Sequence, residues 1–560
     1  MKVWVKGQNS PISLTQRDYV GEGGEGKIHA KGGIAYKTYH DPNKMLPHGK
    51  VQALQAIQDP NVIRPQALLE DQQGKPIGYT MRFIPDAWAL CQLFPKVFRD
   101  RNNLDHPMMQ RLVLKLQHVM KGVHVAGVLL VDANEMNFLV SKDFAEIYAI
   151  DADSYQTPNY PATAIMPSVR DWTITPPHWT EGSDWYAFAC VSFQMFTGIH
   201  PFKGKHPSIK GLEERMKAGI SVFDPKVKVP RATYDFAVIP QAYRDWYEAV
   251  FLHGRRDAPP GDFNVVAIIV PTVKAVTGTD LIEVIELGQY SGNVTRYWTT
   301  GTKRVVLADT MWVDRRQVGK APPKPSGLGF SRGYVPVLVD SSTDVPTLHN
   351  LQDQTTIPFS LKADEVSSYD GRIYMRAGGN LLEIKLTDAG NKVIASTQAV
   401  ANVLPNASHL YPGVLLQDML GSTFASLLIR SGASQQVRIK ELDEYRVLDA
   451  KYDSGVLMAV GEKKGQFDRL VFRFDETFTT YDVRIVEDIQ PTGLNFVTLD
   501  SGVCVCLNED DKLELFSHRK GSSKVKEIED PAISGDMRLG KEGGVVLFSR
   551  GDRLYRMRLK

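Results

Sequence analysis

The sequence has little net charge, few cysteines and no long apolar run. Among its 560 residues, 66 Lys and Arg stand against 64 Asp and Glu, so the formal charge is only +2. Such a small net charge does not predict binding to nucleic acid. The four cysteines, Cys91, Cys190, Cys504 and Cys506, are too few and too scattered for a disulfide scaffold or a zinc site. A reducing, cytoplasmic environment is therefore expected.

The longest apolar stretch, VVAIIVPTVKAV, is short and is broken by Pro271. The first residues, MKVWVKGQNSPISL, contain no apolar signal region. We expect neither secretion nor a membrane span. Hydrophobic residues make up 43% and charged residues 23%, which is ordinary for a globular chain, and the length predicts two to four domains.

The hydrophobic periodicity of the sequence changes near residue 264. Helical periods such as HPMMQRLVLKLQHVMKGVHVAG and SDWYAFACVSFQMF occur before it, and alternating β-rich runs follow it. Pro259, Pro260 and Gly261 would stop any helix at this point. The sequence thus predicts two regions of different architecture.

A glycine-rich segment near the start, YVGEGGEGKIHA, places Gly21, Gly23 and Gly26 in the order G-x-G-x-x-G. Its alternating flanks predict two strands joined by a loop, and the strand IAYKTYH with Lys37 follows about ten residues later. A phosphate-binding loop with its lysine has this spacing, although the motif alone fits an ordinary hairpin turn equally well.

Further along, GVLLVDANEMNFLV sets Asp132 and Asn137 in an otherwise apolar context, and IYAIDADSYQ ends a strand in Asp151 and Asp153. Asp-x-x-x-x-Asn followed by a strand-end aspartate is an arrangement that holds Mg²⁺ on ATP. Each residue also has a structural interpretation as a turn cap, a backbone partner or a helix cap.

In this order the motifs resemble the protein-kinase superfamily, over roughly residues 15–263. The resemblance implies an α+β, bilobal kinase-like domain at 1–263, with an N-lobe at about 1–84 and a C-lobe at about 85–263. The Asp-x-Asp-Ser-Tyr-Gln form is similar to a divergent bacterial branch, with Ser/Thr hydroxyls of proteins as the implied acceptors.

The resemblance also implies roles for individual residues. Asp132 would take the proton of the acceptor hydroxyl, Asn137 and Asp151 would hold Mg²⁺, and Lys37 would contact the α- and β-phosphates of ATP. Asp184 would hydrogen-bond the catalytic-loop backbone, which His124 precedes. The remaining nucleotide-binding residues would be Gly21, Gly23, Gly26, Ile28, the gatekeeper Met81, and Phe83 within the hinge segment 82–84.

Several positions depart from the family pattern. Lys50 stands where the glutamate partner of Lys37 is expected, so either another carboxylate serves, such as Glu70, or the helix is shifted. Asn134 replaces the lysine that usually follows the catalytic aspartate, and it is still expected among the catalytic residues with Asp132 and Lys37. Val131 replaces an arginine. The other departures are Ala152 and Asp153 in place of Phe and Gly, and His178 in place of the Ala-Pro-Glu glutamate. An active kinase and a nucleotide-binding pseudokinase or scaffold therefore both stay open.

The region 264–560 contains repeated hairpin-like units. Their anchor glycines are 42 residues apart in three of four steps, a period typical of propeller blades. We expect an all-β propeller of six or seven blades, with a β-sandwich pair as the alternative. The anchors are Gly371, Gly413, Gly455, Gly502 and Gly544, with weaker ones at Gly292 and Gly333.

Fold analogy implies that the propeller recruits a protein partner. Only two strands follow Gly544, so we expect residues 264–288 to pair with the C-terminal hairpin and close the ring. Cys504 and Cys506 alternate on one strand and are expected to be two buried thiols.

Overall fold

The computed structural model describes residues 1–23, 25–162, 165–176, 178–230, 233–261, 275–300, 303–390, 392–489 and 493–560. The chain forms two compact units. Unit 1 comprises Met1–Asp100 and Leu104–Ile269, and unit 2 comprises Arg101–Asn103 and Val270–Lys560. The expected boundary at residue 263 and the expected strand at 264–274 lie outside the described residues.

Unit 1 begins with a seven-stranded antiparallel sheet in the order β2-β1-β6-β7-β5-β4-β3. One face buries an apolar cluster that includes Val3, Tyr36 and Leu69. The glycine-rich segment forms the hairpin between β3 and β4, so the structure has the expected strand-loop-strand arrangement. The strands are β1 (Lys2–Val5), β2 (Ile12–Ser13), β3 (Tyr19–Glu22), β4 (Gly26–Lys31), β5 (Ile34–Tyr39), β6 (Leu68–Glu70) and β7 (Pro76–Arg82).

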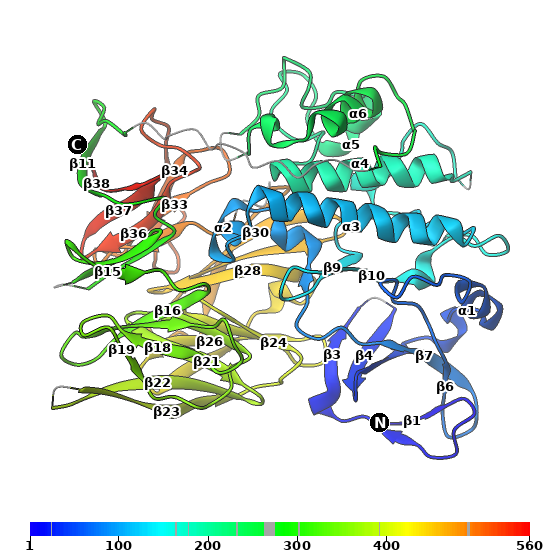
Figure 1. Cartoon of the computed structure of the whole chain (residues 1–560), viewed down its shortest axis with the longest axis horizontal. Helices are drawn as coiled ribbons and strands as arrows, with labels where there is room; N and C mark the ends of the chain where they lie inside the picture. Colours follow the sequence, from blue (N-terminus) through cyan, green and yellow to red (C-terminus); the bar gives the residue numbers. More distant parts are fainter. Residues whose placement is uncertain are drawn as a thin grey trace. The chain divides into compact units, whose positions relative to one another are not determined.

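The rest of unit 1 is mainly helical, and its two longest helices, α3 and α4, contact each other (Figure 1). Asp105 caps the start of α3 by accepting a hydrogen bond from the Met108 amide, and Thr180 caps α4 from the Ser183 amide. Every residue of α4 from Ser183 to Thr197 is buried, so α4 is the central helix of this part. The helices are α1 (His48–Leu54), α2 (Lys96–Arg101), α3 (His106–Val125), α4 (Glu181–Thr197), α5 (Leu212–Ala218) and α6 (Gln241–Phe251).

A small antiparallel sheet in the order β10-β9-β8 positions the polar motifs of unit 1. Its strands are β8 (Trp88–Ala89), β9 (Phe138–Val140) and β10 (Ile147–Ala149). Asn137 immediately precedes β9, and Asp151 follows two residues after the end of β10. Because β9 and β10 are paired, the two motifs lie next to each other although they are distinct in sequence.

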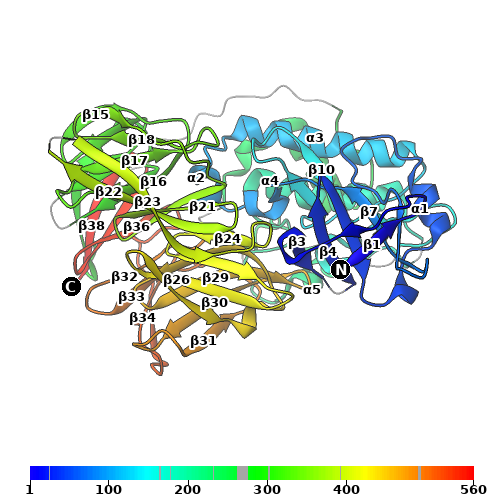
Figure 2. The same ribbon diagram turned by 90° about the horizontal axis from the view of Figure 1, so that it is seen from below.

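The described part of unit 2 forms seven four-stranded antiparallel sheets, which is compatible with a propeller-like domain and not with the two large sheets of a sandwich. Figure 2 shows β29, β30 and β31 of one sheet and β32, β33 and β34 of the next. The first three sheets consist of β12 (Arg296–Thr299), β13 (Arg304–Leu307), β14 (Thr310–Val313) and β15 (Arg316–Lys320); β16 (Pro325–Phe330), β17 (Pro336–Asp340), β18 (Thr347–Asn350) and β19 (Thr355–Ile357); and β20 (Glu365–Tyr369), β21 (Arg372–Ala377), β22 (Asn380–Ala389) and β23 (Lys392–Asn402).

The next three sheets follow the same order along the chain. They consist of β24 (Ser408–Tyr411), β25 (Val414–Asp418), β26 (Thr423–Arg430) and β27 (Ala433–Arg438); β28 (Arg446–Asp453), β29 (Val456–Lys463), β30 (Gln466–Phe474) and β31 (Tyr481–Val486); and β32 (Phe496–Thr498), β33 (Val503–Leu507), β34 (Leu513–Ser517) and β35 (Val525–Ile528).

The seventh sheet combines strands from both ends of unit 2. Its order is β11-β38-β37-β36, and β11 (Ile282–Gln289) pairs antiparallel with β38 (Arg553–Leu559). The other two strands are β36 (Arg538–Glu542) and β37 (Val545–Arg550). The first strand of the seventh sheet, β36, contacts the first strands of both the sixth and the first sheet, β32 and β12. The sheets therefore form a closed series within unit 2.

The backbone conformation of one turn explains the 42-residue repeat of glycines. Four of the anchor glycines lie in the turn between the first and second strands of a sheet, with φ between +71° and +93°. Residues other than glycine rarely adopt this conformation, so these four sheets repeat a glycine at the same turn. These four are Gly371, Gly413, Gly455 and Gly502, and in the seventh sheet Gly543, not Gly544, has the positive φ.

Candidate functional site

The glycine-rich hairpin uses its three glycines differently. A Cβ atom on Gly26 would lie 2.2 Å from the carbonyl oxygen of Thr38, so close packing of β4 on β5 requires glycine there. A Cβ atom on Gly21 or Gly23 would meet nothing within 4 Å. The Gly23 amide donates to the Gly26 carbonyl at 2.9 Å and closes the turn. Packing inside the chain thus explains the glycine at position 26 but not those at positions 21 and 23.

Lys37 is the centre of a cluster of carboxylates. Its side chain extends from β5, is only 10% exposed, and places Nζ 2.6 Å from Oδ2 of Asp153. The same Nζ lies 3.2 Å from Glu25 and 3.7 Å from Asp151. Asp153 lies on η4 (Ala152–Ser154), so the contact joins segments that are 116 residues apart.

Two tyrosines enclose this ion pair. The Tyr39 hydroxyl donates to Oδ2 of Asp153 at 3.1 Å. The Lys37 ammonium lies 5.2 Å from the centre of the Tyr39 ring and 5.7 Å from that of Tyr79. Burial opposes the charge of Asp153, but the Lys37 ammonium holds the pKa of that carboxyl below its usual range. Asp153 is therefore the anionic partner of the buried lysine.

Asp151 differs from its neighbour two residues away. Its side chain is 43% exposed, and its backbone is left-handed with φ +60°. Partial burial and the Asp153 carboxylate both raise the pKa of Asp151, and the Lys37 ammonium acts in the opposite direction. A carboxylate in this position is stabilised by an additional cation.

Asn137 lies beside the Asp151 segment, since its carbonyl accepts a hydrogen bond from the Ile150 amide at 2.9 Å. Its side-chain nitrogen donates to the Asp132 carbonyl at 2.9 Å and to Asp132 Oδ2 at 3.3 Å. The described hydrogen bonds of the Asn137 side chain use its nitrogen, so its Oδ1 could serve as an oxygen ligand. A carboxylate and an amide oxygen suit Mg²⁺, which completes its coordination with water and phosphate oxygens.

No cluster of three or more His, Cys, Asp or Glu side chains suited to a metal occurs in the described ranges of the chain. A metal held by Asp151 and Asn137 alone would therefore depend on ligands from a bound phosphate.

Asp132 lies in a loop whose backbone is fixed by hydrogen bonds to a side chain of α4. The Asp184 carboxylate, fully buried in α4, accepts hydrogen bonds from the amides of Leu130 and Val131 at 2.8 Å each. The ring of His124 contacts the same carboxylate at 2.8 Å. Val131 has φ +62°, a strained conformation for a β-branched residue that costs of order 1–3 kcal/mol. The two hydrogen bonds to Asp184 fix this conformation.

The Asp132 side chain makes contacts on both oxygens. Oδ1 accepts a hydrogen bond from the Met166 amide at 2.8 Å, and Oδ2 faces Asn137. Burial raises the pKa of Asp132, although hydrogen bonds from Asn134, Met166 and Asn137 act in the opposite direction. Asn134 is 1% exposed, and its Oδ1 accepts from the Met136 amide at 2.7 Å, so it stabilises the loop.

The other expected nucleotide-binding residues lie on the same sheet as Lys37. Ile28 on β4 is the cross-strand partner of Lys37, and Met81 on β7 is the partner of Ala35. Both side chains are half-buried. Phe83 follows β7 directly, and its amide donates to the Gly33 carbonyl at 3.0 Å.

Another carboxylate does pair with Lys37, as one of the two alternatives held, but it is not Glu70. Glu70 pairs with Trp4 at the end of β6, and no contact between Glu70 and Lys37 occurs among the described residues. The carboxylate beside Lys37 is Asp153, which the sequence pattern marked only as a departure. Lys50 lies on α1 and is 2% exposed.

One buried ion pair has no signal in the sequence. Arg256 Nε lies 2.5 Å from Oδ2 of Asp171, and Arg256 Nη2 donates to Oδ1 at 3.0 Å. Asp171 is 1% exposed, and the pair joins segments 85 residues apart.

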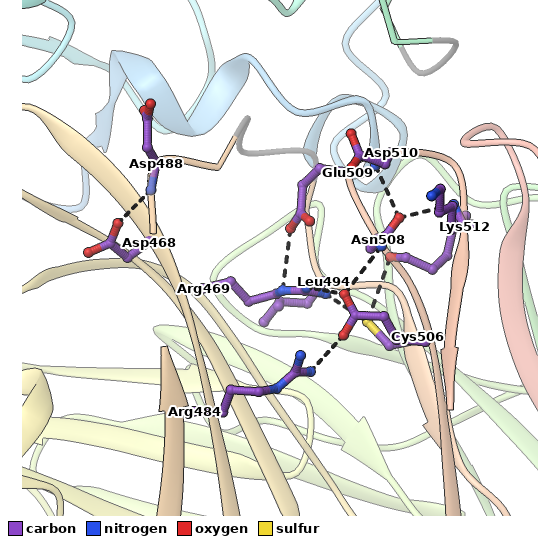
Figure 3. Close-up of polar contacts among 12 residues, drawn as sticks. Asp468, Arg469, Arg484, Asp488, Leu494, Cys506, Asn508, Glu509, Asp510 and Lys512 are labelled. Atoms are coloured by element: carbon purple, nitrogen blue, oxygen red, sulfur yellow. Dashed lines mark hydrogen bonds and ion pairs between the residues drawn. The ribbon is translucent and has the colours of Figure 1, made fainter. Parts of the chain in front are cut away.

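Unit 2 also contains a buried charged cluster, between its fifth and sixth sheets (Figure 3). Arg469 donates to Glu514 at 2.6 Å and to the Cys506 sulfur at 3.0 Å, and its Nε lies 3.4 Å from Glu509. Arg484 donates to the other oxygen of Glu514 at 2.6 Å. The two arginines and the two glutamates balance each other's charge within the protein. Their contacts connect β30 and β31 of one sheet to β33 and β34 of the next.

The thiols of Cys504 and Cys506 are both buried, as expected, and burial raises the pKa of Cys506 to about 12. They are therefore inert at neutral pH.

Neither a known family model nor a curated protein sequence matches the chain. Within the described residues, no helix has the length and apolar character needed to cross a membrane.

Proposed function

We propose that unit 1 binds ATP with Mg²⁺ and transfers its terminal phosphate to Ser or Thr hydroxyls of a protein, which unit 2 recruits. One observation carries the proposal: Lys37, Asp151 and Asp153, from two distant segments, meet beside the loop of Asp132 and Asn137. A buried lysine, a strand-end carboxylate and an Asp-Asn loop are the groups that phosphoryl transfer from ATP requires.

In the proposed reaction the chain mainly positions groups and balances charge. The Gly21–Gly26 hairpin would cover the phosphates, and Lys37 would contact them from β5. Asn137 and Asp151 would hold Mg²⁺, which neutralises charge on the phosphates when bound. The acceptor oxygen would bond to the γ-phosphorus as the bond to the β-γ bridging oxygen breaks, and Asp132 would take the hydroxyl proton.

A second candidate function, nucleotide binding without transfer, is favoured by the contact between the Met166 amide and Asp132 Oδ1. An acceptor hydroxyl has to replace this hydrogen bond to reach the carboxylate. If the Met166 segment keeps its place, unit 1 would bind ATP and serve as a scaffold.

Incubation of the full chain with labelled ATP and Mg²⁺, followed by mass spectrometry of the chain and of added proteins, tests the proposal. Label on Ser or Thr supports transfer. Thermal stabilisation by Mg-ATP without label would favour the scaffold, and the absence of both effects would contradict nucleotide binding altogether.

A further inference from the structure

We propose that Lys50 is a second phosphate-binding cation of the site, which takes the place of the lysine that Asn134 replaces. The inference rests on the proposed nucleotide binding of unit 1, but not on transfer. Family resemblance assigns a glutamate to this position, so the proposal comes from the environment of Lys50 in the structure.

Lys50 is buried with almost no partner. It is 2% exposed, and the acceptor that it reaches among the described residues is the Pro161 carbonyl, 3.4 Å from Nζ. A buried ammonium is normally paired with a carboxylate or with several hydrogen-bond acceptors, because removing it from water is costly. A buried charge with one long hydrogen bond is therefore a candidate for a ligand contact.

Helix α1, which carries Lys50, lies next to the candidate nucleotide site. Helix α1 contacts η4, which carries Asp153. A Cβ atom on the adjacent Gly49 would lie 2.1 Å from the Tyr160 hydroxyl, so glycine there allows α1 to pack closely on the segment after η4. Burial lowers the pKa of Lys50, and the carboxylates of Asp153, Asp151 and Glu25 oppose this shift. The same three carboxylates surround Lys37.

The charge balance of the site explains why a second cation is needed. Lys37 is the single cation in contact with Asp153, Glu25 and Asp151 among the described ion pairs, so the carboxylates outnumber it. A triphosphate adds several negative charges to this cluster. Asn134 contributes none of the positive charge that a lysine would supply, and its side chain is used by the Met136 amide. In this proposal Lys50, on α1, supplies that charge.

Lys50→Met tests the inference, because methionine keeps most of the side-chain volume and removes the charge. Calorimetric titration of the full chain with Mg-ATP should show an affinity about ten- to hundredfold lower than that of the wild type. Adenosine, which has no phosphate, should bind both proteins equally. Without ligand, the variant should melt no lower than the wild type, since a poorly paired buried charge is removed.

Two variants complete the test. Lys50→Arg should keep Mg-ATP affinity within a few-fold, and Lys44→Met, an exposed lysine on η2 (Pro42–Lys44), should behave as the wild type. Unchanged Mg-ATP affinity in Lys50→Met would overturn the inference, as would an equal loss of ATP and adenosine together with a lower melting temperature.

The role of Lys50 in binding and the proposed kinase activity can be distinguished by experiment. A wild-type chain that binds Mg-ATP in a Lys50-dependent manner without transferring phosphate supports the inference and rejects the kinase activity. A wild-type chain that does not bind Mg-ATP overturns both.

Discussion

Lys37 and Asp153 form a buried ion pair, with Nζ 2.6 Å from Oδ2 and both side chains at most 10% exposed. The pair connects β5 of the first sheet to η4 after the small sheet. It therefore links the two parts of unit 1 and defines the position of the lysine in the candidate site.

The first prediction concerns this pair. Asp153→Asn should lower the free energy of unfolding of unit 1 by about 3 kcal/mol, because it leaves a buried ammonium poorly compensated. Urea unfolding followed by tryptophan fluorescence measures it, since six of the eight tryptophans precede residue 262. As a control, Glu25→Gln removes a partner that is 64% exposed and should change stability by less than about 0.5 kcal/mol. Equal effects of the two variants would contradict the assignment.

The second prediction addresses the chemistry. Asp132→Asn should reduce phosphate transfer by about 10²- to 10⁴-fold while Mg-ATP still raises the melting temperature, because only the proton acceptor is lost. Asp151→Asn should abolish transfer and also the Mg²⁺ dependence of ATP binding. Asp143→Asn, an exposed aspartate between β9 and β10, is the matched control. Transfer at the wild-type rate in either test variant would exclude the proposed roles.

The third prediction concerns the buried pair of Asp171 and Arg256. Asp171→Asn should destabilise unit 1 by about 3 kcal/mol, since the guanidinium loses a two-point contact in a buried position. Asp257→Asn breaks a neighbouring contact to Arg255 in which both side chains are more than half exposed. Its effect should stay below about 0.5 kcal/mol, and a comparable loss in both variants would argue against the difference in burial.

The fourth prediction is a pH dependence from His200. The ring is buried, Nε2 lies 2.8 Å from the Ser168 carbonyl, and Nδ1 accepts from the Phe202 amide, which fixes the neutral form. Burial lowers the pKa of His200 to about 3. Between pH 6.5 and 3 the unfolded state binds a proton that the folded state does not, so this histidine reduces stability as pH falls, by about 1.4 kcal/mol per pH unit.

His200→Gln, which keeps one donor and one acceptor, should remove this slope in urea unfolding measured from pH 7 to pH 4. His253→Gln alters an exposed ring and should keep it. Parallel pH profiles of the wild type and His200→Gln would contradict the prediction.

The fifth prediction tests the seventh sheet. Deletion of residues 544–560 removes β37 and β38, including the buried Phe548, Leu554 and Tyr555, and leaves β11 and β36 without their partners. Calorimetry should show loss of the unit 2 transition and retention of the unit 1 transition, with rapid proteolysis after residue 275. A unit 2 that melts cooperatively without these residues would show that the closed series is not needed for its stability.

Local sequence patterns determined the features of this protein that depend on neighbouring residues. The glycine period of unit 2 follows from a turn that needs positive φ, and the strand-loop-strand segment follows from the alternation around Gly21–Gly26. The pairing of the strand at 280–287 with the C-terminal hairpin was anticipated from counting strands.

Contacts between distant segments were decided only by the tertiary structure. Nothing near Lys37 in sequence indicates that Asp153 is its partner, and nothing near Arg256 indicates Asp171. Glu70 was expected only as an example of another carboxylate, on the following strand, whereas η4 places the Asp153 carboxylate 2.6 Å from Lys37 Nζ. Lys50 appears in sequence as a charge in the wrong place, and only its burial on α1 indicates a cation without a close partner. Side-chain pairing across 85 or 116 residues depends on how the elements pack, and local propensity contains no information about that packing.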